Sequence, residues 1–413
     1  MLEQMGKQAQ AAEAVLALTT TEQRNGALRA IAAALEAAMP EILAANAGDM
    51  ARGRENGMSQ ALLDRLELTE GRVKSAAEGV LAAAALPDPL DRLLEETVRP
   101  NGLRLRKVSV PIGVIAVIYE ARPNVTVDSA ALCLKSGNAV ILRGGKEAAA
   151  SNQILAEVMR RALRNSGLPE DCIQLVQDTS RKSAEALMKL SGYVDVLIPR
   201  GGPGLIRAAV EGASVPVIQT GAGTCHVYVD AAADVEMAAK IIYNAKTSRP
   251  SVCNAAECIL VHASIAEVAL PAIAAALQKK QVEIRGDERV RALLPQAVAA
   301  AEDDWGREYG DYILAARVVD SMEEALDHIR RYGTKHSECI VTQDEAAAAR
   351  FLRSVDAAAV YHNASTRFTD GGEFGLGAEI GISTQKLHAR GPLGLRELTS
   401  MKYLVLGEGQ VRT

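Results

Sequence analysis

The sequence predicts an α/β protein with two parallel-sheet domains and a small separate β element. Three patterns lead to this fold class. From about residue 112 short apolar runs alternate with helical segments, and a second series of the same kind begins near residue 235. Alternating strands and helices indicate a parallel sheet with right-handed crossovers. Before the first of these series, an Asn-Gly turn at Asn101 and Gly102 precedes alternating apolar and polar residues, which indicates a hairpin.

The first 90 residues are predicted to be helical, and the first α/β series follows them. Thr21 begins an amphipathic run with Leu28 and Leu35 on one face, and Thr69 opens another helix. In the α/β series the expected strands are residues 112–118, 139–142, 173–176, 194–198 and 215–218, and the expected helices are 125–136, 146–166, 180–190 and 204–212.

The second series has the same character and ends in a polar tail. Its expected strands are residues 257–261, 282–284, 312–319, 338–341 and 358–361, and its expected helices are 235–245, 264–280, 322–331 and 345–355. The tail from Asn363 is rich in glycine. It ends in an apolar run at 401–406, which we expect to be an edge strand able to pair with another subunit.

The composition excludes several classes of function. The 413 residues carry a net charge of -5 and no basic block, so nucleic acid is not an expected partner. No apolar run reaches the roughly 18 residues of a membrane span, and the N-terminus has no signal pattern. Six scattered cysteines without a CxxC pair indicate reduced thiols in the cytoplasm. Six histidines lack HxxxH and HExxH spacing, so no metal site is expected.

Cys253 is the candidate nucleophile, and Asn124 is its candidate partner. Cys253 lies between a helical stretch and an apolar run, with the cation Arg249 shortly before it. Asn124 lies in the loop after a buried strand, where an amide can hold an oxyanion. The alternative for Cys253 is an inert buried thiol. Cys258 is expected in the core, and the pair Cys225-His226 would point to opposite faces of a strand.

Two strand ends carry residues suited to a dinucleotide. Arg143 and Lys146 flank two glycines at the carboxyl end of a strand, where open α/β sheets bind ligands, and both cations suit a phosphorylated ribose. The turn with Gly201, Gly202 and Gly204 opens a helix, so its N–H groups can face a pyrophosphate, although it does not match GxGxxG. The alternatives are solvated charges and a plain glycine turn.

A loop after the last strand of the second series suits an amino-acid head group. It carries Asn363, Ser365, Arg367 and Asp370. An arginine can bind a carboxylate, and an aspartate can bind an ammonium group. The alternative is a solvated turn.

Taken in order, these segments resemble the aldehyde dehydrogenase superfamily over nearly the whole chain. The closest likeness is to its branch that reduces an acyl phosphate of glutamate. The resemblance is carried by the segments YEARPNVT (119–126), KTSRPSVCN (246–254), NASTRFTDGG (363–372) and STQKLHARGP (383–392). It implies an aldehyde-dehydrogenase-like fold. It also implies a cofactor domain at 1–94 and 113–230, a catalytic domain at 231–362, oligomerisation elements at 95–112 and 395–413, and a substrate loop returning to the cofactor domain at 363–394.

The resemblance also assigns roles to residues. Cys253 falls on the catalytic thiol and Asn124 on the oxyanion-holding asparagine. Arg143, Lys146, Gly201, Gly202, Gly204 and Glu308 fall on or near cofactor positions. A cation at Lys146, where NAD-preferring members often have a glutamate, implies NADPH/NADP. Arg122, Ser365 and Arg367 are expected to contact the phosphate or the α-carboxylate of the substrate.

One departure from the wider superfamily bears on the product. Members that make free acids use a glutamate to activate water, and the matching strand end here carries Gln219 and Thr220. Neither is a base near neutral pH, so phosphate rather than water is the expected partner of the thioester. The resemblance thus implies NADPH-dependent reduction of L-glutamyl 5-phosphate in proline biosynthesis.

The resemblance further implies a cytoplasmic homo-oligomer, a dimer or tetramer, functionally coupled to glutamate 5-kinase. The alternatives are a hydrolytic aldehyde dehydrogenase and a catalytically inactive scaffold.

Overall fold

The computed structural model describes residues 1–412, so Thr413, the last residue of the expected tail, lies outside the described residues. The chain forms two compact units. The first comprises residues 1–220, 375–381 and 393–413, and the second comprises residues 221–374 and 382–392. No described helix is both long and apolar enough to cross a membrane.

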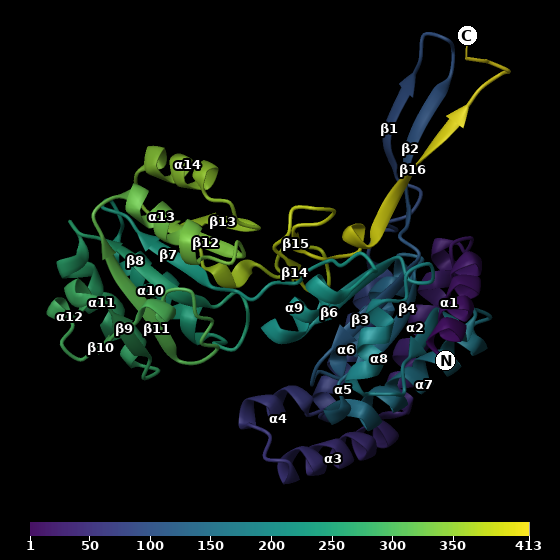
Figure 1. Ribbon diagram of the computed structural model, residues 1–413, viewed down its shortest axis with the longest axis horizontal. Coiled ribbons are helices and arrows are strands. Elements are labelled where there is room, and N and C mark those ends of the chain that lie inside the picture. Colours follow the sequence, from purple (N-terminus) through teal and green to yellow (C-terminus); the bar gives the residue numbers. More distant parts are fainter. Residues whose placement is uncertain (413) are drawn as a thin grey trace. The chain divides into compact units, whose positions relative to one another are not determined.

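Five helices begin the first unit, in the region where the sequence predicts helical structure (Figure 1). Thr20 caps the second helix with a full capping box: its Oγ1 accepts from the N–H of Gln23, and the Gln23 side chain accepts from the N–H of Thr20. Thr69 caps the fifth helix. The helices are α1 (Leu2–Leu16), α2 (Thr21–Ala37), α3 (Met39–Glu55), α4 (Gln60–Leu66) and α5 (Glu70–Ala85).

A four-stranded parallel sheet forms the centre of the first unit, in the order β5-β4-β3-β6. Its two central strands are buried along their whole length, which explains their uninterrupted apolar sequences. The strands are β3 (Val114–Tyr119), β4 (Ala139–Gly144), β5 (Ile173–Leu175) and β6 (Val196–Arg200), and the connecting helices are α6 (Asn124–Lys135), α7 (Ala149–Asn165), α8 (Arg181–Met188) and α9 (Pro203–Gly212).

The expected strand at 215–218 is wrong. Only Val217 forms an isolated bridge there, with Leu197 of β6. Leu197 donates to the carbonyl of Pro216 and accepts from the N–H of Ile218. Because a proline has no N–H to donate, Pro216 interrupts the ladder that the apolar pattern suggests.

The second unit is built on a seven-stranded parallel sheet, in the order β10-β9-β11-β8-β7-β12-β13. The strands are β7 (Cys225–Val229), β8 (Ala256–His262), β9 (Glu283–Gly286), β10 (Val298–Ala299), β11 (Ile313–Val319), β12 (Ser337–Val341) and β13 (Ala359–His362), and the helices are α10 (Val235–Thr247), α11 (Ala266–Gln278), α12 (Glu288–Leu293), α13 (Met322–Tyr332) and α14 (Glu345–Ser354).

The boundary between the two units lies at Thr220, whereas the sequence placed it at residue 230. The difference is strand β7. It lies between β8 and β12, so it belongs to the second sheet.

An antiparallel sheet of β1 (Leu93–Val98), β2 (Arg104–Pro111) and β16 (Thr399–Leu406) projects from the first unit as a narrow ribbon (Figure 1). Its hairpin turn contains Gly102 at φ +85°, a conformation that glycine adopts without strain. The strand expected at 401–406 is therefore present, and it is an edge strand. In the tail, β14 (Ile382–Ser383) pairs with β15 (Gly391–Pro392).

Candidate active site

Cys253 lies in the turn that joins α10 to β8, and its thiol is partly exposed. The backbone of this turn is held against Gly223. A side-chain carbon at position 223 would overlap the carbonyl oxygen of Cys253, so only glycine fits there. The Cys225 thiol donates to the same carbonyl at 3.2 Å. The start of strand β7 therefore fixes the backbone of the thiol-bearing turn.

Asn254 fixes the other side of this turn. Its Nδ2 donates to the carbonyl of Thr369 at 2.9 Å, and its own carbonyl accepts from the hydroxyl of Thr366 at 2.7 Å. Asn254 is buried, as are Thr366 and Thr369. Sequence reasoning did not single out Asn254, because an asparagine beside a candidate nucleophile gives no signal of a distant partner.

Arg367 joins both ends of the same segment. Its Nε donates to the Ser248 hydroxyl at 3.0 Å, and its Nη1 donates to Oδ1 of Asn254. Burial, then the nearby charge of Arg249, lower the pKa of Arg367, while the charge of Cys253 opposes this. The Ser365 hydroxyl accepts from the N–H of Arg367 at 3.3 Å. The structure thus brings Cys253, Ser365 and Arg367 into one neighbourhood.

Asn124 and Arg122 belong to the first unit, at the carboxyl end of β3. Asn124 begins α6 and is exposed, and its Nδ2 donates to Oδ2 of Asp128 at 3.1 Å. Burial raises the pKa of Asp128 to about 6, although Asn124 and the charge of Arg200 act in the opposite sense. Asp128 therefore sets the direction of the amide. The Arg122 carbonyl accepts from the N–H of Val125 at 3.0 Å.

The two cations at the end of β4 have different surroundings. Nη2 of Arg143 donates to the carbonyls of Thr179 and Ser180 at 2.6 and 2.7 Å. Burial lowers the pKa of Arg143. Lys146 is exposed and makes no hydrogen bond or ion pair with any residue from 1 to 412. Lys146 is therefore available for an anion, whereas Arg143 is already bonded to the chain.

The glycine turn lies between β6 and α9, as expected. Gly201, Gly202 and Gly204 are exposed. The N–H of Gly202 donates to Oε2 of Glu120 at 2.8 Å. A carboxylate thus occupies this donor at a helix start, which shows that the turn accommodates an anion. A pyrophosphate would replace Glu120 there. With the free ammonium of Lys146, these residues fit a phosphorylated dinucleotide.

Glu308 is exposed and lies near a buried ion pair that sequence reasoning missed. Nζ of Lys246 donates to Oε2 of Glu257 at 2.6 Å, and both side chains are fully buried. Burial raises the pKa of Glu257 to about 7, against the effect of Lys246, and the charge of Glu308 raises it further. Burial also lowers the pKa of Lys246, against the effect of Glu257. The sequence signal for this buried ion pair was Glu257, a glutamate inside an apolar run.

Comparisons with known proteins agree with this α/β fold. The model of the aldehyde dehydrogenase family matches residues 2–294. The chain belongs to the aldehyde dehydrogenase family. An engineered glycolyl-CoA reductase with bound NADP+ shares the fold, with a TM-score of 0.70 at 17% identity over 98% of this chain and 96% of that one.

The most informative relatives narrow the family further. Gamma-glutamyl phosphate reductase of Moorella thermoacetica is 60% identical over 98% of this chain and 97% of its own. That of Halothermothrix orenii is 58% identical over 95% and 94%. The crystal structure of the Thermotoga maritima gamma-glutamyl phosphate reductase has a TM-score of 0.97 at 47% identity and covers 99% of both chains. The chain therefore lies among the gamma-glutamyl phosphate reductases.

Proposed function

We propose that this enzyme reduces L-glutamyl 5-phosphate to L-glutamate 5-semialdehyde and phosphate with NADPH, the second step of proline biosynthesis. The observation that carries this function is the thiol turn: Cys253 is fixed by Gly223 and Asn254 within a chain that matches gamma-glutamyl phosphate reductases over nearly its full length.

The reaction proceeds through a thioester on Cys253. The thiolate attacks the γ-carbonyl carbon, and the developing oxyanion is assigned to Asn124 and the backbone N–H of Cys253, each contributing about 3 kcal/mol. The carbon–oxygen bond to phosphate breaks, and phosphate leaves. NADPH, when bound, would supply the hydride that reduces the thioester carbon. The thiohemiacetal on Cys253 then releases the aldehyde and regenerates the thiolate.

Phosphate, not water, is the partner of the thioester in the reverse direction. The positions that could activate water carry Gln219 and Thr220, and the hydroxyl of Thr220 donates to the carbonyl of Pro199 at 2.6 Å. Neither side chain can take a proton from water near neutral pH. This favours the phosphorylating reaction over the hydrolytic alternative.

We assign the substrate anions to Arg122, Arg367 and Ser365. The guanidinium of Arg367 is partly buried and lies beside the thiol turn, where it donates to Asn254. We assign a substrate anion to this same guanidinium. Burial strengthens such a contact because little water competes for the charge.

We assign the cofactor to the ends of β4 and β6 and to Glu308. Lys146 offers an unpaired ammonium to the 2′-phosphate of NADP, and Arg143 lies shortly before it in the chain, at the end of β4. The N–H groups of Gly201, Gly202 and Gly204 suit the pyrophosphate. Glu308 is assigned to the nicotinamide ribose.

The remaining assignments concern the setting of the enzyme. It acts on a small molecule, in the cytoplasm, as a homo-oligomer. Its substrate is an acyl phosphate that water can hydrolyse. This supports functional coupling to the glutamate 5-kinase that makes it.

The test follows NADP reduction by glutamate 5-semialdehyde with and without phosphate. The expected rate depends on phosphate, and Cys253→Ala abolishes it. Cys172→Ala is the matched control, because Cys172 is a buried thiol of the first unit whose Sγ donates to the carbonyl of Ala12 in α1. A rate that does not depend on phosphate contradicts the inference that Gln219 cannot activate water. Full activity in Cys253→Ala contradicts a thioester on Cys253.

A further inference from the structure

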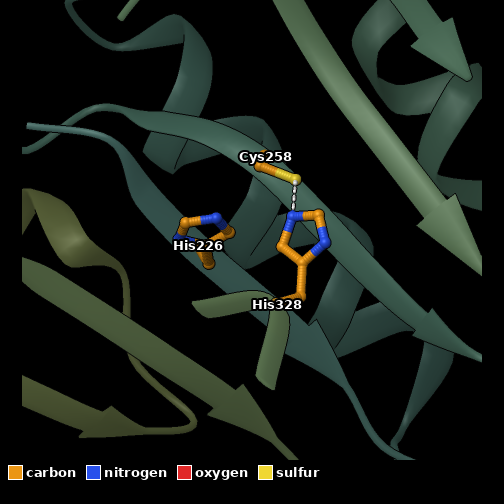
Figure 2. Close-up of side chains that lie close together, drawn as sticks. All are labelled: His226, Cys258 and His328. Atoms are coloured by element: carbon orange, nitrogen blue, oxygen red, sulfur yellow. Dashed lines mark hydrogen bonds between the residues drawn. The ribbon is translucent and has the colours of Figure 1, made fainter. Parts of the chain in front are cut away.

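Two histidines and a cysteine converge inside the second unit (Figure 2). His226 lies on β7, Cys258 on β8 and His328 on α13. All three are buried, and their nearest ligand atoms lie within 4.8 Å of one another. The spacing along the sequence hides this cluster, because each residue comes from a different element.

The fold fixes the three side chains on one side of the sheet. His226 and Cys258 are register partners on adjacent strands, so their side chains share a face. Cys258 packs in the same apolar cluster as Leu326 and Ile329 of α13, which brings His328 over that face. The cluster therefore rests on two strands and one helix rather than on a mobile loop.

His226 is oriented like a metal ligand. Its Nδ1 lies 3.0 Å from Oε2 of Glu338, and the same oxygen accepts from its backbone N–H at 2.7 Å. Its Nε2 is buried and has no hydrogen-bond partner among the described residues. A carboxylate on one ring nitrogen, with the other left open, is the arrangement around metal-bound histidines. A buried nitrogen without a hydrogen-bond partner is otherwise unfavourable, because burial removes the water that would bind it.

The other two donors already lie at the separation a metal requires. Cys258 Sγ and His328 Nε2 are 3.7 Å apart, and the dashed line in Figure 2 marks their interaction. Tetrahedral zinc, with bonds of about 2.3 Å to sulfur and 2.0–2.1 Å to nitrogen, places such ligand atoms roughly 3.5 Å apart. Because all three ligand atoms lie within 4.8 Å of one another, a contraction of at most roughly 1.5 Å at His226 completes the triangle.

We propose that His226, Cys258 and His328 form a zinc site. The ion binds Nε2 of both histidines and the thiolate of Cys258, whose proton leaves to solvent, and water takes the fourth position. The two charges of the ion balance the thiolate and the carboxylate of Glu338, so the buried site becomes neutral. The ion cross-links β7, β8 and α13.

Arg317, a neighbour of His328, disfavours the bound ion. Nη1 of Arg317 lies 3.4 Å from Nδ1 of His328. A guanidinium only donates, so it favours the tautomer whose proton sits on Nε2, where the ion binds. Zinc must move that proton to Nδ1, facing Arg317. Arg317 is partly exposed and paired with Glu324 at 3.1 Å, so it can move aside.

The test is a metal titration of Cys253→Ala protein, because the catalytic thiol would itself bind zinc. Protein freed of metal by chelation is titrated with Co²⁺. About one equivalent is expected to give a thiolate-to-cobalt charge-transfer band, which zinc removes. Zinc is also expected to raise the Tm. None of these readouts depends on activity, so the proposal and the proposed function can fail separately.

Matched variants locate the ion. Adding Cys258→Ala abolishes the band, adding Cys339→Ala leaves it unchanged, and adding His328→Gln weakens binding about 100-fold, so a folding defect in one ligand variant leaves the other informative. Arg317→Gln is expected to tighten binding, because glutamine can accept from Nδ1–H. The absence of any band, or the same band in the Cys258→Ala protein, overturns the proposal.

Discussion

At the scale of single residues, backbone geometry rather than side-chain chemistry decides how the nucleophile is held. Gly223 faces the carbonyl of Cys253, and Asn254 is bonded to the loop that carries Thr366 and Thr369. These residues hold the turn, and they carry no proton or charge in the reaction. Their effect is expected on kcat, because they set the position of the attacking atom.

Gly223→Ala is expected to lower kcat about 100-fold, since a methyl group there displaces the Cys253 carbonyl and a shift near 1 Å costs about that much. Steady-state kinetics measure it. The control is Gly26→Ala, in the middle of α2 with open space around it, which leaves kcat unchanged and stabilises the protein by about 0.5–1 kcal/mol. Unchanged kcat in Gly223→Ala contradicts the assigned role.

Asp128 predicts a pH dependence of stability. Its pKa in the folded protein is about 6, against 3.8 for the free side chain. Below about pH 4 Asp128 is protonated in both the folded and the unfolded protein. Above about pH 6 the folded protein must hold the Asp128 carboxylate in its charged form, which burial disfavours. Relative to Asp128→Asn, the wild type is therefore expected to lose roughly 1–3 kcal/mol as pH rises from 4 to 6. Urea unfolding at several pH values measures this difference; a constant difference refutes it.

At the scale of elements, α10 and β8 bracket the thiol turn, and the Lys246–Glu257 pair joins them. The pair links the end of α10 directly to the start of β8, in addition to the turn that connects them in the chain. Its position between the two elements explains why a charged pair is tolerated in the core: each partner satisfies the other, and Gly310 donates a further hydrogen bond to Glu257 at 3.2 Å.

Lys246→Met is expected to destabilise the protein by about 3–5 kcal/mol, because it leaves the Glu257 carboxylate buried without a counter-charge. The double variant Lys246→Met/Glu257→Leu is expected to recover most of this loss. The free energy of unfolding at pH 8 checks both. If the single and double variants are equally unstable, the pair does not act as a coupled unit.

The sequence predicted most elements because their periodicity is strong. The buried strands β3 and β4 read as uninterrupted apolar runs, and Thr20 and Thr69 marked helix starts. The prediction of a strand at 215–218 was wrong because apolar character does not show which backbone groups find hydrogen-bond partners. The contacts of Arg143 with Thr179 and Ser180, and the convergence of His226 with Cys258 and His328, depend on three-dimensional packing, which no spacing rule reveals.

At the scale of the whole molecule, the antiparallel ribbon is the surface most suited to another subunit. Met401, Tyr403 and Val405 alternate along β16, so they share one face, and each is more than half exposed. Apolar residues exposed in a row on an edge strand are unusual unless a partner covers them.

Tyr403→Glu is expected to shift the protein to a smaller assembly, since a charge on this face opposes burial. Size-exclusion chromatography with light scattering measures the mass. Lys402→Glu, on the opposite face of β16, is the control and is expected to keep the wild-type mass. An unchanged mass in Tyr403→Glu excludes this face as the contact.

The chain passes between its two units four times, and this has a consequence for synthesis on the ribosome. Residues 1–220 emerge first, but strand β16 at 399–406 emerges last and covers the open edge of β2. From the synthesis of β2 at Arg104–Pro111 until that of β16, the edge has unpaired N–H and C=O groups. The nascent chain therefore carries an exposed strand while both parallel sheets are being made, and chaperone dependence is expected to lie there rather than in either sheet.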